Sequence, residues 1–292
     1  MTMNILVTGA SGQLGLSVRD ASECSDHNFI FSDIKPSDGI IPLDVTDPDA
    51  VGKILMDKDI SVIINCASYT DVNKAESETE AADKVNCEAA GILAEAAAVR
   101  GVLLIHISTD YVFDGNSSRP YAEDASAAPV NAYGRSKFAG EKAVEASGCR
   151  YLILRTSWLY SNYGRNFYKT MVELTAANPV LKVVSDQIGT PTCASDLAEA
   201  LVTIIDEEIP FESGIYHYSN EGVCSWYDFA KEICSGVGHL CDVMPCRTED
   251  YPTPAVRPAF SVLDKTKFKE TFGIEIPHWR ESLMSCIALR NE

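Results

Sequence analysis

Short apolar runs alternate with helix-like segments along the first half of the chain. The runs read NILVTG, FIFSD, SVIINCAS, VLLIHIS and YLILRTS, and they begin at residues 4, 29, 61, 102 and 151. Successive positions in each run are apolar, so we expect strands buried on both faces, as in a parallel sheet covered by helices. The clearest helix lies at residues 80–100, where alanines fall among Glu and Lys. This alternation predicts a doubly wound α/β sheet, whose ligands bind at the carboxyl ends of the strands.

The pattern changes after about residue 155. Helical segments at residues 166–177, 195–207 and 226–235 are separated by short strands and by loops such as DQIGTPT and YPTPAVRP. No Gly/Ser or Pro-rich linker separates the two halves. We therefore expect a dinucleotide-type sheet domain over residues 1–160 and a smaller mixed α/β C-terminal lobe over residues 161–292. The lobe is expected to pack directly on the sheet domain, and the chain can cross between the two more than once. A cleft between the two is expected.

Composition narrows the class of protein. The chain has 292 residues, is 46% hydrophobic and 23% charged, and carries a formal net charge of -18. This acidic balance argues against nucleic acid or an anionic membrane as a partner. No apolar run reaches the ~18 residues that span a bilayer, and no secretory signal is recognised ahead of the first strand, so we expect a cytoplasmic protein.

Ten cysteines are scattered among the expected strands and helices, without a C-x-x-C pair or a spacing typical of zinc ligands. We expect reduced core thiols and no metal site. The five histidines are isolated from one another. His106, inside an apolar run, is expected to be a strand residue and not a ligand.

A glycine-rich turn follows the first expected strand. VTGASGQLG places Gly9, Gly12 and Gly15 between a strand and a helix, where backbone N–H groups at the helix N-terminus bind a pyrophosphate. Asp33 ends the second expected strand. It lies at about the sequence separation from the glycines at which an acid contacts the adenosine ribose in dinucleotide-binding folds. Asp44 and Val45 follow another short apolar run, IIPL at residues 40–43, and are expected to flank the adenine. The alternative for the turn is a tight connection without a ligand, and for the acids it is loop capping. The pattern favours a Rossmann-type dinucleotide fold.

A second group of residues supplies chemistry. Ser108 and Thr109 end the run LLIHIS, so they face the same crevice as the glycine turn. In the stretch YGRSK, Tyr133 and Lys137 lie four residues apart, on one face of a helix. An ammonium within ~4 to 6 Å is expected to lower the pKa of the phenol by two or three units, which makes Tyr133 a general acid. Thr109 would hold the carbonyl oxygen of a substrate that receives hydride from a reduced nicotinamide. Lys137 would also hydrogen-bond the ribose of that nicotinamide.

These motifs together resemble those of the extended short-chain dehydrogenase/reductases, which modify nucleotide-linked sugars. The segments NCASYTDVNKAE, STDYVFDG, YGRSKFAGE, RTSWLYSNYGRNF, DQIGTPT and PTPAVRP resemble, in this order, the dTDP-4-dehydrorhamnose reductases. The resemblance spans nearly the whole chain. It implies reduction of a 4-keto sugar to the dTDP-L-rhamnose used in cell-surface polysaccharide precursors, with NADPH or NADH as the cofactor.

The resemblance also implies roles for individual residues. Those of the catalytic group are Thr109, Tyr133 and Lys137. Those that line the dinucleotide are Gly9, Gly12, Gln13, Leu14, Gly15, Asp33, Asp44, Val45, Ala67, Ser68, Tyr69, Thr70 and Ile107, together with Tyr133 and Lys137. Asp110 and Trp158 match positions that contact the sugar beside Thr109. We assign Asn166 and Arg257 to the nucleotide diphosphate, because a guanidinium suits phosphate oxygens.

Two positions depart from the family pattern. Some bacterial relatives dimerise through a metal held by glutamates, at positions where this chain has Ser17 and Ser195. A hydroxyl is not a hard carboxylate ligand. We therefore expect a monomer or a weak homodimer without a bridging metal.

Three other functions are weighed against reduction. A dehydratase would place an acidic pair after Thr109, but Asp110 is followed by Tyr111. An epimerase needs the same Thr, Tyr and Lys and remains open, as does another nucleotide-sugar reductase of the superfamily. A regulatory subunit that binds a dinucleotide without turnover would not need Tyr133. Cofactor choice stays open too, because Asp33 repels a 2′-phosphate whereas Lys35 is placed to tolerate it.

Overall fold

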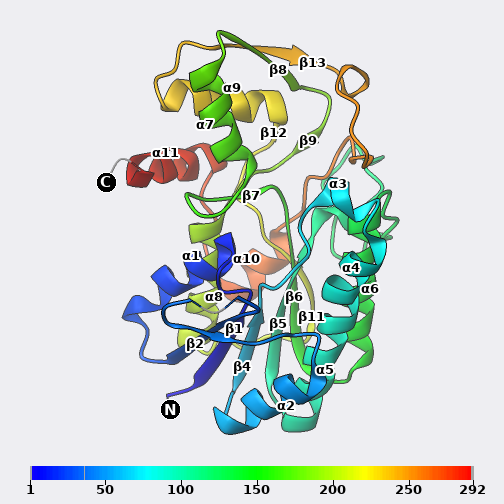
Figure 1. Ribbon diagram of the computed structural model, residues 1–292, viewed down its shortest axis with the longest axis vertical. Coiled ribbons are helices and arrows are strands. Elements are labelled where there is room, and N and C mark those ends of the chain that lie inside the picture. Colours follow the sequence, from blue (N-terminus) through cyan, green and yellow to red (C-terminus); the bar gives the residue numbers. More distant parts are fainter. Residues whose placement is uncertain (1, 36, 291–292) are drawn as a thin grey trace.

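The computed structural model describes residues 2–35 and 37–290 and shows two lobes, one above the other in Figure 1. The larger lobe contains a seven-stranded sheet in the order β11-β6-β5-β4-β1-β2-β3. All neighbouring strands are parallel. The strands are β1 (Asn4–Thr8), β2 (Asn28–Asp33), β3 (Ile40–Pro42), β4 (Val62–Asn65), β5 (Leu103–Thr109), β6 (Arg150–Thr156) and β11 (Gly214–His217). The doubly wound, Rossmann-type prediction is confirmed.

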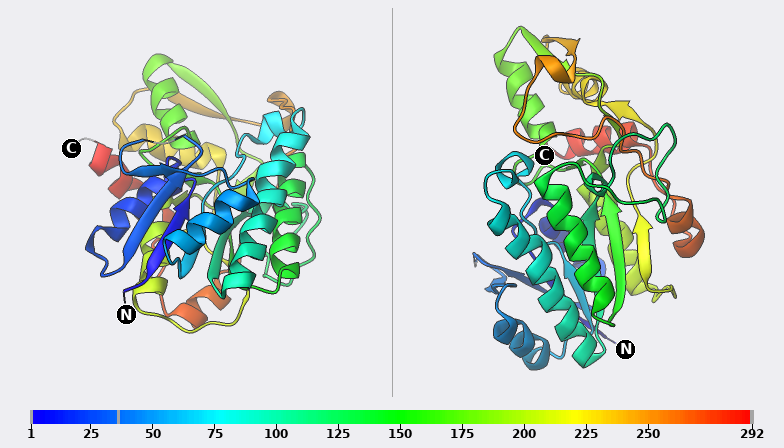
Figure 2. Two further views of the ribbon diagram at one scale, coloured as in Figure 1. Left: turned by 60° about the horizontal axis from the view of Figure 1, so that its bottom comes forward. Right: turned by 90° about the vertical axis from the view of Figure 1, so that its right-hand side faces the viewer.

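Helices cover both faces of this sheet, as Figure 2 shows from two sides. One face carries α1 (Gln13–Ala21), α8 (Ala194–Asp206) and α10 (Thr266–Phe272). The other carries α2 (Pro48–Asp57), α5 (Ala89–Arg100) and α6 (Ala132–Ala146). Alternate strand residues pack into the two cores: Ile5 and Val7 into the first, Leu6 into the second. Burial on both faces explains why the strand sequences are apolar at successive positions.

The smaller lobe has its own core. It contains α7 (Phe167–Ala177), α9 (Trp226–Gly236) and α11 (Trp279–Arg290), and short pairs formed by β7 (Leu159–Tyr160) with β10 (Thr192–Cys193), β8 (Val180–Val184) with β13 (Asp242–Cys246), and β9 (Ile188–Gly189) with β12 (Cys224–Ser225). Aromatic side chains fill its centre, with Phe229, Trp279 and Tyr160 fully or almost fully buried. The prediction that the lobe is mixed α/β is confirmed.

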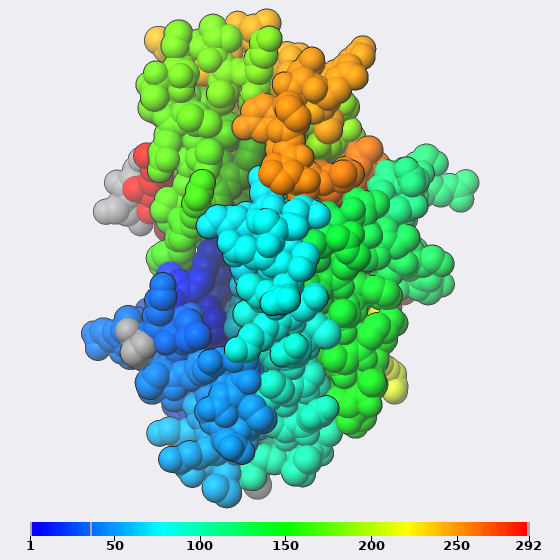
Figure 3. Space-filling view, turned by 45° about the vertical axis from the view of Figure 1, so that its right-hand side comes forward, coloured from blue at the N-terminus to red at the C-terminus, as the bar shows by residue number. Residues whose placement is uncertain are grey.

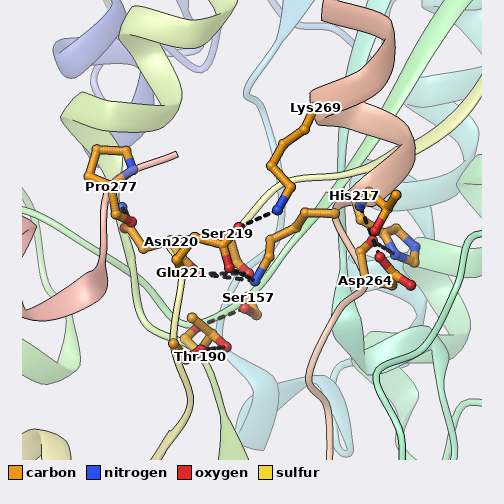
Figure 4. Close-up of polar contacts among 12 residues, drawn as sticks. Ser157, Thr190, His217, Ser219, Asn220, Glu221, Asp264, Lys269 and Pro277 are labelled. Carbon is orange, nitrogen blue, oxygen red and sulfur yellow. Dashed lines mark hydrogen bonds and ion pairs between the residues drawn. The ribbon is translucent and has the colours of Figure 1, made fainter. Parts of the chain in front are cut away.

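The chain crosses between the lobes more than once. α8, β11 and α10 follow residue 160 in sequence, yet they pack on or join the sheet of the larger lobe. Polar side chains hold these crossings together (Figure 4). The Ser157 hydroxyl donates to the carbonyl of Thr190 at 2.7 Å, and the buried Asn220 amide donates to the carbonyl of Pro277 at 3.2 Å. The division at residue 160 stays a prediction.

One helix departs from the sequence expectation. The helix predicted at residues 80–100 is present, but it consists of α4 (Thr79–Asp83), a π-helical turn (Lys84–Glu88) and α5. The wider turn directs the buried Asn86 side chain toward the loop after β4, where its Oδ1 accepts from the N–H of Tyr69 at 2.8 Å. π-Helical turns often occur at functional sites. The helix propensity of the residues predicts a helix here but does not indicate where the turn widens.

The cysteines meet their expectation in part, and His106 lies where a strand residue was expected. All ten cysteines are free thiols, but only five of them are buried and Cys24 is exposed, so the expectation of core thiols holds for half of them. His106 lies in β5 with its Nδ1 3.0 Å from the amide of Asn65, as expected for a strand residue. In residues 2–35 and 37–290, no helix has the length and apolar character needed to span a bilayer.

Candidate active site

A cavity of about 1290 Å³ opens above the carboxyl ends of the strands, between the two lobes. In Figure 3 it is the hollow bordered by the light green, orange and cyan segments, with dark blue N-terminal atoms at its lower side. All the residues assigned from the sequence to the catalytic group, the dinucleotide and the sugar nucleotide line this cavity. The structure therefore brings the residues assigned from the sequence together in one cavity.

The glycine turn connects β1 to α1 without space for side chains. Gly9 has a φ of +65°, and a Cβ at this position would lie 2.5 Å from the backbone nitrogen of Ala67. A Cβ at Gly15 would lie 2.5 Å from the Cα of Ala10. Gly12 is the N-cap of α1 and has no side chain to occupy the helix N-terminus. The free N–H groups there and the partial positive charge of the helix suit a pyrophosphate.

The two acids expected near the adenosine both line the cavity. Asp33 ends β2, and its carboxylate accepts from the N–H groups of Ser11 and Lys35, both at 3.1 Å. It thereby joins the glycine turn to the loop after β2. Asp44 accepts from Thr46 at 2.7 Å, and this hydrogen bond is the main reason that its pKa is lowered. Each acid therefore caps a loop while its carboxylate faces the cavity.

Thr109, Asp110 and Tyr133 form the centre of the cavity. Thr109 ends β5, and its hydroxyl donates to Asp110 at 3.1 Å. Burial raises the pKa of Asp110 to about 7, although hydrogen bonds from Ser261 and Thr109 partly offset this effect. Tyr133 follows the helix cap Asn131, whose side chain accepts from the N–H of Gly134 at 2.7 Å. The Tyr133 ring is half-buried and faces the cavity, not the bulk solvent.

The expectation that Lys137 lowers the pKa of Tyr133 is wrong for this structure. The Lys137 ammonium, one turn further along α6, donates to the carbonyl of Ile107 at 2.6 Å and is 2% exposed. Burial lowers the pKa of this ammonium to about 8. Burial also raises the pKa of Tyr133 to about 12, and the hydroxyl of Thr109 only partly offsets this. The phenol therefore keeps its proton over the whole neutral range.

Trp158 borders the other half of the cavity. Its φ of 47° is in the left-handed region, which bulky residues rarely adopt, and such strain is concentrated at functional sites. The ring stacks on Trp226 at a centroid distance of 3.5 Å. The indole also packs on Gly189, where a Cβ would lie 2.6 Å from the ring. These two contacts hold the indole at the wall of the cavity.

The two residues assigned to the diphosphate differ in what their side chains do. Arg257 donates to the hydroxyl of Thr253 at 2.8 Å, and its guanidinium borders the cavity. Asn166 instead caps α7, because its Oδ1 accepts from the N–H of Lys169 at 3.0 Å. Its amide nitrogen donates to Gln13 Oε1 and to the carbonyls of Ser161 and Tyr163. In this structure Asn166 therefore acts as an anchor for the loop.

Several residues that line the cavity were missed by the sequence reasoning. The cations are Lys84, Arg165 and Lys182, and the apolar side chains are Phe167, Met171, Leu174, Leu181 and Trp226. Most come from those parts of α7, β8 and α9 that lie outside the quoted motifs, although Arg165 and Phe167 end the motif RTSWLYSNYGRNF. Apolar residues that recur with the period of a helix predict a buried face. The pattern does not indicate whether that face packs on the core or lines a ligand site. A chain with a net charge of -18 needs local positive potential to bind an anion, and these cations supply it at the cavity.

The chain matches known proteins in family, sequence and structure. The RmlD substrate binding domain family matches residues 3–291. A dTDP-4-dehydrorhamnose reductase of Burkholderia thailandensis is 40% identical over 98% of both chains. The crystal structure of a dTDP-4-dehydrorhamnose reductase of Clostridium acetobutylicum has a TM-score of 0.93 and 42% identity, over 99% of this chain and 100% of that chain.

A second structure contains a cofactor. The dTDP-4-dehydrorhamnose reductase of Bacillus anthracis in complex with NADP has a TM-score of 0.92 and 36% identity, over 99% of this chain and 100% of that chain. Similarity of this degree extends over both lobes and is not limited to the dinucleotide fold. The chain therefore belongs to the RmlD family of dTDP-4-dehydrorhamnose reductases.

Proposed function

We propose that the chain reduces the 4-keto group of dTDP-4-dehydro-6-deoxy-L-mannose (dTDP-4-dehydrorhamnose) to give dTDP-L-rhamnose, with NADPH or NADH as the reductant. The observation that carries this proposal is that Thr109, Tyr133 and Lys137 line one cavity that also contains the glycine turn. Family membership supplies the substrate class, and the cavity supplies the residues that act on it.

The residues present fit a dinucleotide. A Cβ at Gly9 or Gly15 would fill the turn, so the absence of side chains there leaves room for close approach of a pyrophosphate. Asp33 is placed for the adenosine ribose, and the backbone after β4, at Ala67 and Ser68, follows the same wall of the cavity. Bound nicotinamide supplies the hydride that the carbonyl carbon receives.

The protein's own residues supply the proton and hold the substrate oxygen. Tyr133 carries its proton at neutral pH, because burial raises its pKa to about 12. The oxygen of a ketone that accepts hydride becomes an alkoxide, which is a stronger base than a phenolate, so the proton moves from the Tyr133 hydroxyl to that oxygen. Thr109 donates a hydrogen bond to the same oxygen. Lys137 is proposed to hydrogen-bond the nicotinamide ribose, while Tyr133 and Thr109 act on the substrate oxygen.

The sugar nucleotide is proposed to extend from Tyr133 toward the smaller lobe. Trp158 offers an apolar face to the deoxy sugar, and Asp110 offers a carboxyl to its hydroxyls. Arg257 is proposed for the diphosphate, for which its guanidinium is suited. Asn166 holds the loop beside it, and its direct contact with the diphosphate stays a prediction.

The test is consumption of NADPH or NADH, followed at the absorbance band of the reduced nicotinamide. The panel contains dTDP-4-dehydrorhamnose, the corresponding UDP 4-keto sugar and dTDP-4-keto-6-deoxyglucose. We expect fastest oxidation with dTDP-4-dehydrorhamnose and a rhamnose product. Cofactor that stays bound and is never consumed, while the sugar changes configuration, would instead indicate an epimerase. Binding of a dinucleotide without turnover of any sugar would indicate a regulatory subunit.

We infer that the protein works in the cytoplasm, as a monomer or a weak homodimer without a bridging metal. Ten free thiols suit a reducing compartment. Ser17 and Ser195 lie in α1 and α8, which pack against each other, and neither offers a carboxylate. Sedimentation of the purified protein with Mg²⁺ and with EDTA tests this inference, and a dimer that dissociates only in EDTA would contradict it.

A further inference from the structure

The side chain of Gln13 connects the glycine turn to the other lobe. Gln13 is the first residue of α1, directly after Gly12. Its Nε2 donates to the carbonyl of Leu159 at 3.2 Å, and its Oε1 accepts from the amide of Asn166 at 3.2 Å. The Ser161 hydroxyl lies 3.5 Å from the same Oε1. The side-chain amide of Gln13 therefore hydrogen-bonds to Leu159 and Asn166, at the two ends of residues 159–166. These residues, called the segment below, lead from β7 into α7.

This segment packs along α1. Gly164, with a φ of +59°, lies beside Gln13, and a Cβ there would be in ordinary contact with the Cβ of Gln13 at 3.8 Å. The Tyr163 hydroxyl donates to Asp20, near the end of α1, at 2.7 Å. The segment is thus joined to α1 at two places, but only Gln13 lies at the cavity.

The two ends of the segment also form the wall of the sugar site. Trp158 precedes the segment and stacks on Trp226 at 3.5 Å, while Phe167 follows it and contacts the same ring at 4.5 Å. Both ends of the segment therefore meet at one aromatic cluster. Movement of the segment relative to α1 would therefore move Trp158, whose backbone is held in the left-handed region.

We infer that Gln13 is a positioning residue that couples the binding of the dinucleotide to the binding of the sugar nucleotide. A pyrophosphate at the N-terminus of α1 holds the turn that carries Gln13, and Gln13 holds the segment that ends at Trp158. The coupling is reciprocal, because each ligand changes the affinity for the other by the same factor. The inference rests on the proposed function, since the second ligand is the nucleotide sugar.

The test measures binding of two ligands that do not react with each other, NADPH and dTDP-L-rhamnose. The dissociation constant of dTDP-L-rhamnose is measured by calorimetry with and without saturating NADPH. The ratio of the two constants is the coupling factor. For the wild-type protein we expect a factor of about 5 to 10, at the lower end of common allosteric couplings.

Two substitutions remove the contact from opposite sides. Gln13→Leu keeps the volume of the side chain and the backbone N–H that faces the pyrophosphate. Asn166→Asp keeps the cap of α7, since Asp is as good a cap as Asn, but removes the amide donor. In both variants we expect the coupling factor to fall below about 2. Asp20→Asn is the control, because it changes charge on the same helix but leaves an acceptor for Tyr163.

The outcomes separate this inference from the function on which it rests. A wild-type coupling factor near 1, or a factor in Gln13→Leu equal to that of the wild type, would overturn the inference alone. If wild-type protein binds NADPH but does not bind dTDP-L-rhamnose in either state, the proposed function fails and the inference fails with it. Thermal unfolding of each variant shows whether loss of coupling arises in a folded protein.

Discussion

Glu141 and Arg155 form a bidentate ion pair in the interior, one helical turn beyond Lys137. Arg155 Nε and Nη2 donate to the two carboxylate oxygens at 2.8 and 2.7 Å, and the Arg155 and Glu141 side chains are 2% and 0% exposed. The Ser108 hydroxyl donates to the same carboxylate. Ser108 precedes Thr109 on β5, and Arg155 lies opposite Ser108 on β6. The pair therefore fixes α6, which carries Tyr133, against the strands that carry Thr109.

Removal of one partner of this pair is expected to destabilise the fold strongly. Arg155→Met leaves the Glu141 carboxylate buried without its counter-charge, which costs about 3–5 kcal/mol. The double variant Arg155→Met with Glu141→Gln removes both charges and should recover most of that loss. Urea unfolding gives the free energies. The control is Lys142→Met on the same helix, whose ion pair with Glu145 is exposed and is worth about 0.2–1 kcal/mol. An Arg155→Met protein within about 1 kcal/mol of the wild type would refute the assignment.

Reduction is expected to slow at alkaline pH through Lys137. Burial lowers the pKa of this ammonium to about 8, so it is charged below that pH and neutral above it. Because the charged form is proposed to hold the nicotinamide ribose, kcat/KM falls as pH rises through about 8. Lys137→Arg should move this fall to higher pH, because a guanidinium keeps its proton. Lys142→Arg is the exposed control and should leave the profile unchanged.

Asp110 must be separated from that titration, because its pKa is raised to about 7 by burial. In Asp110→Asn any change near pH 7 disappears, while the fall near pH 8 stays. A wild-type profile that is flat from pH 7 to 9.5 would rule out a role for the charge on Lys137.

Two Gly→Ala substitutions are expected to act in opposite directions. At Gly9 the φ of +65° and the 2.5 Å approach to Ala67 leave no place for a methyl group. We expect Gly9→Ala to lower the free energy of unfolding by about 1–3 kcal/mol and to weaken NADPH binding at least tenfold. Gly52 lies inside α2, and a Cβ added there would meet nothing within 4 Å, so Gly52→Ala should stabilise by about 0.5–1 kcal/mol. Unfolding curves and NADPH fluorescence titrations measure both. Tight NADPH binding by Gly9→Ala would show that the turn is not the pyrophosphate site.

Asp33 is expected to influence the choice between the two cofactors. Its carboxylate accepts from two backbone N–H groups at the place assigned to the adenosine ribose. Asp33→Asn removes the negative charge that repels a 2′-phosphate. We expect the ratio of kcat/KM with NADPH to kcat/KM with NADH to rise about tenfold, which corresponds to about 1.4 kcal/mol. A ratio that changes less than twofold would place the ribose elsewhere.

The sequence predicted the sheet, and it predicted that the candidate residues share one cavity, because both depend on local patterns. Strands that are apolar at successive positions require cover on both faces, and the glycine turn and Tyr133 belong to motifs of fixed spacing. The left-handed backbone of Trp158, the π-helical turn that directs Asn86 and the contacts of Gln13 could not be predicted. They depend on packing between segments far apart in sequence, such as Gln13 and Leu159, which are 146 positions apart.

The pKa of Tyr133 could not be predicted for the same reason. The spacing of Tyr133 and Lys137 on one helix face suggested that the ammonium would lower it. The direction depends instead on how deeply both groups are buried, and on the Ile107 carbonyl that accepts from Lys137. Neither is visible in a motif.

The central claim is that Tyr133 donates the proton to the substrate oxygen, and turnover by Tyr133→Phe tests it most directly. The substitution removes only the hydroxyl, so the fold and the cofactor site are preserved. We predict that kcat for dTDP-4-dehydrorhamnose falls by about 10²–10⁴, while the dissociation constant for NADPH changes less than about threefold. A Tyr133→Phe protein that turns over at the wild-type rate would contradict the account.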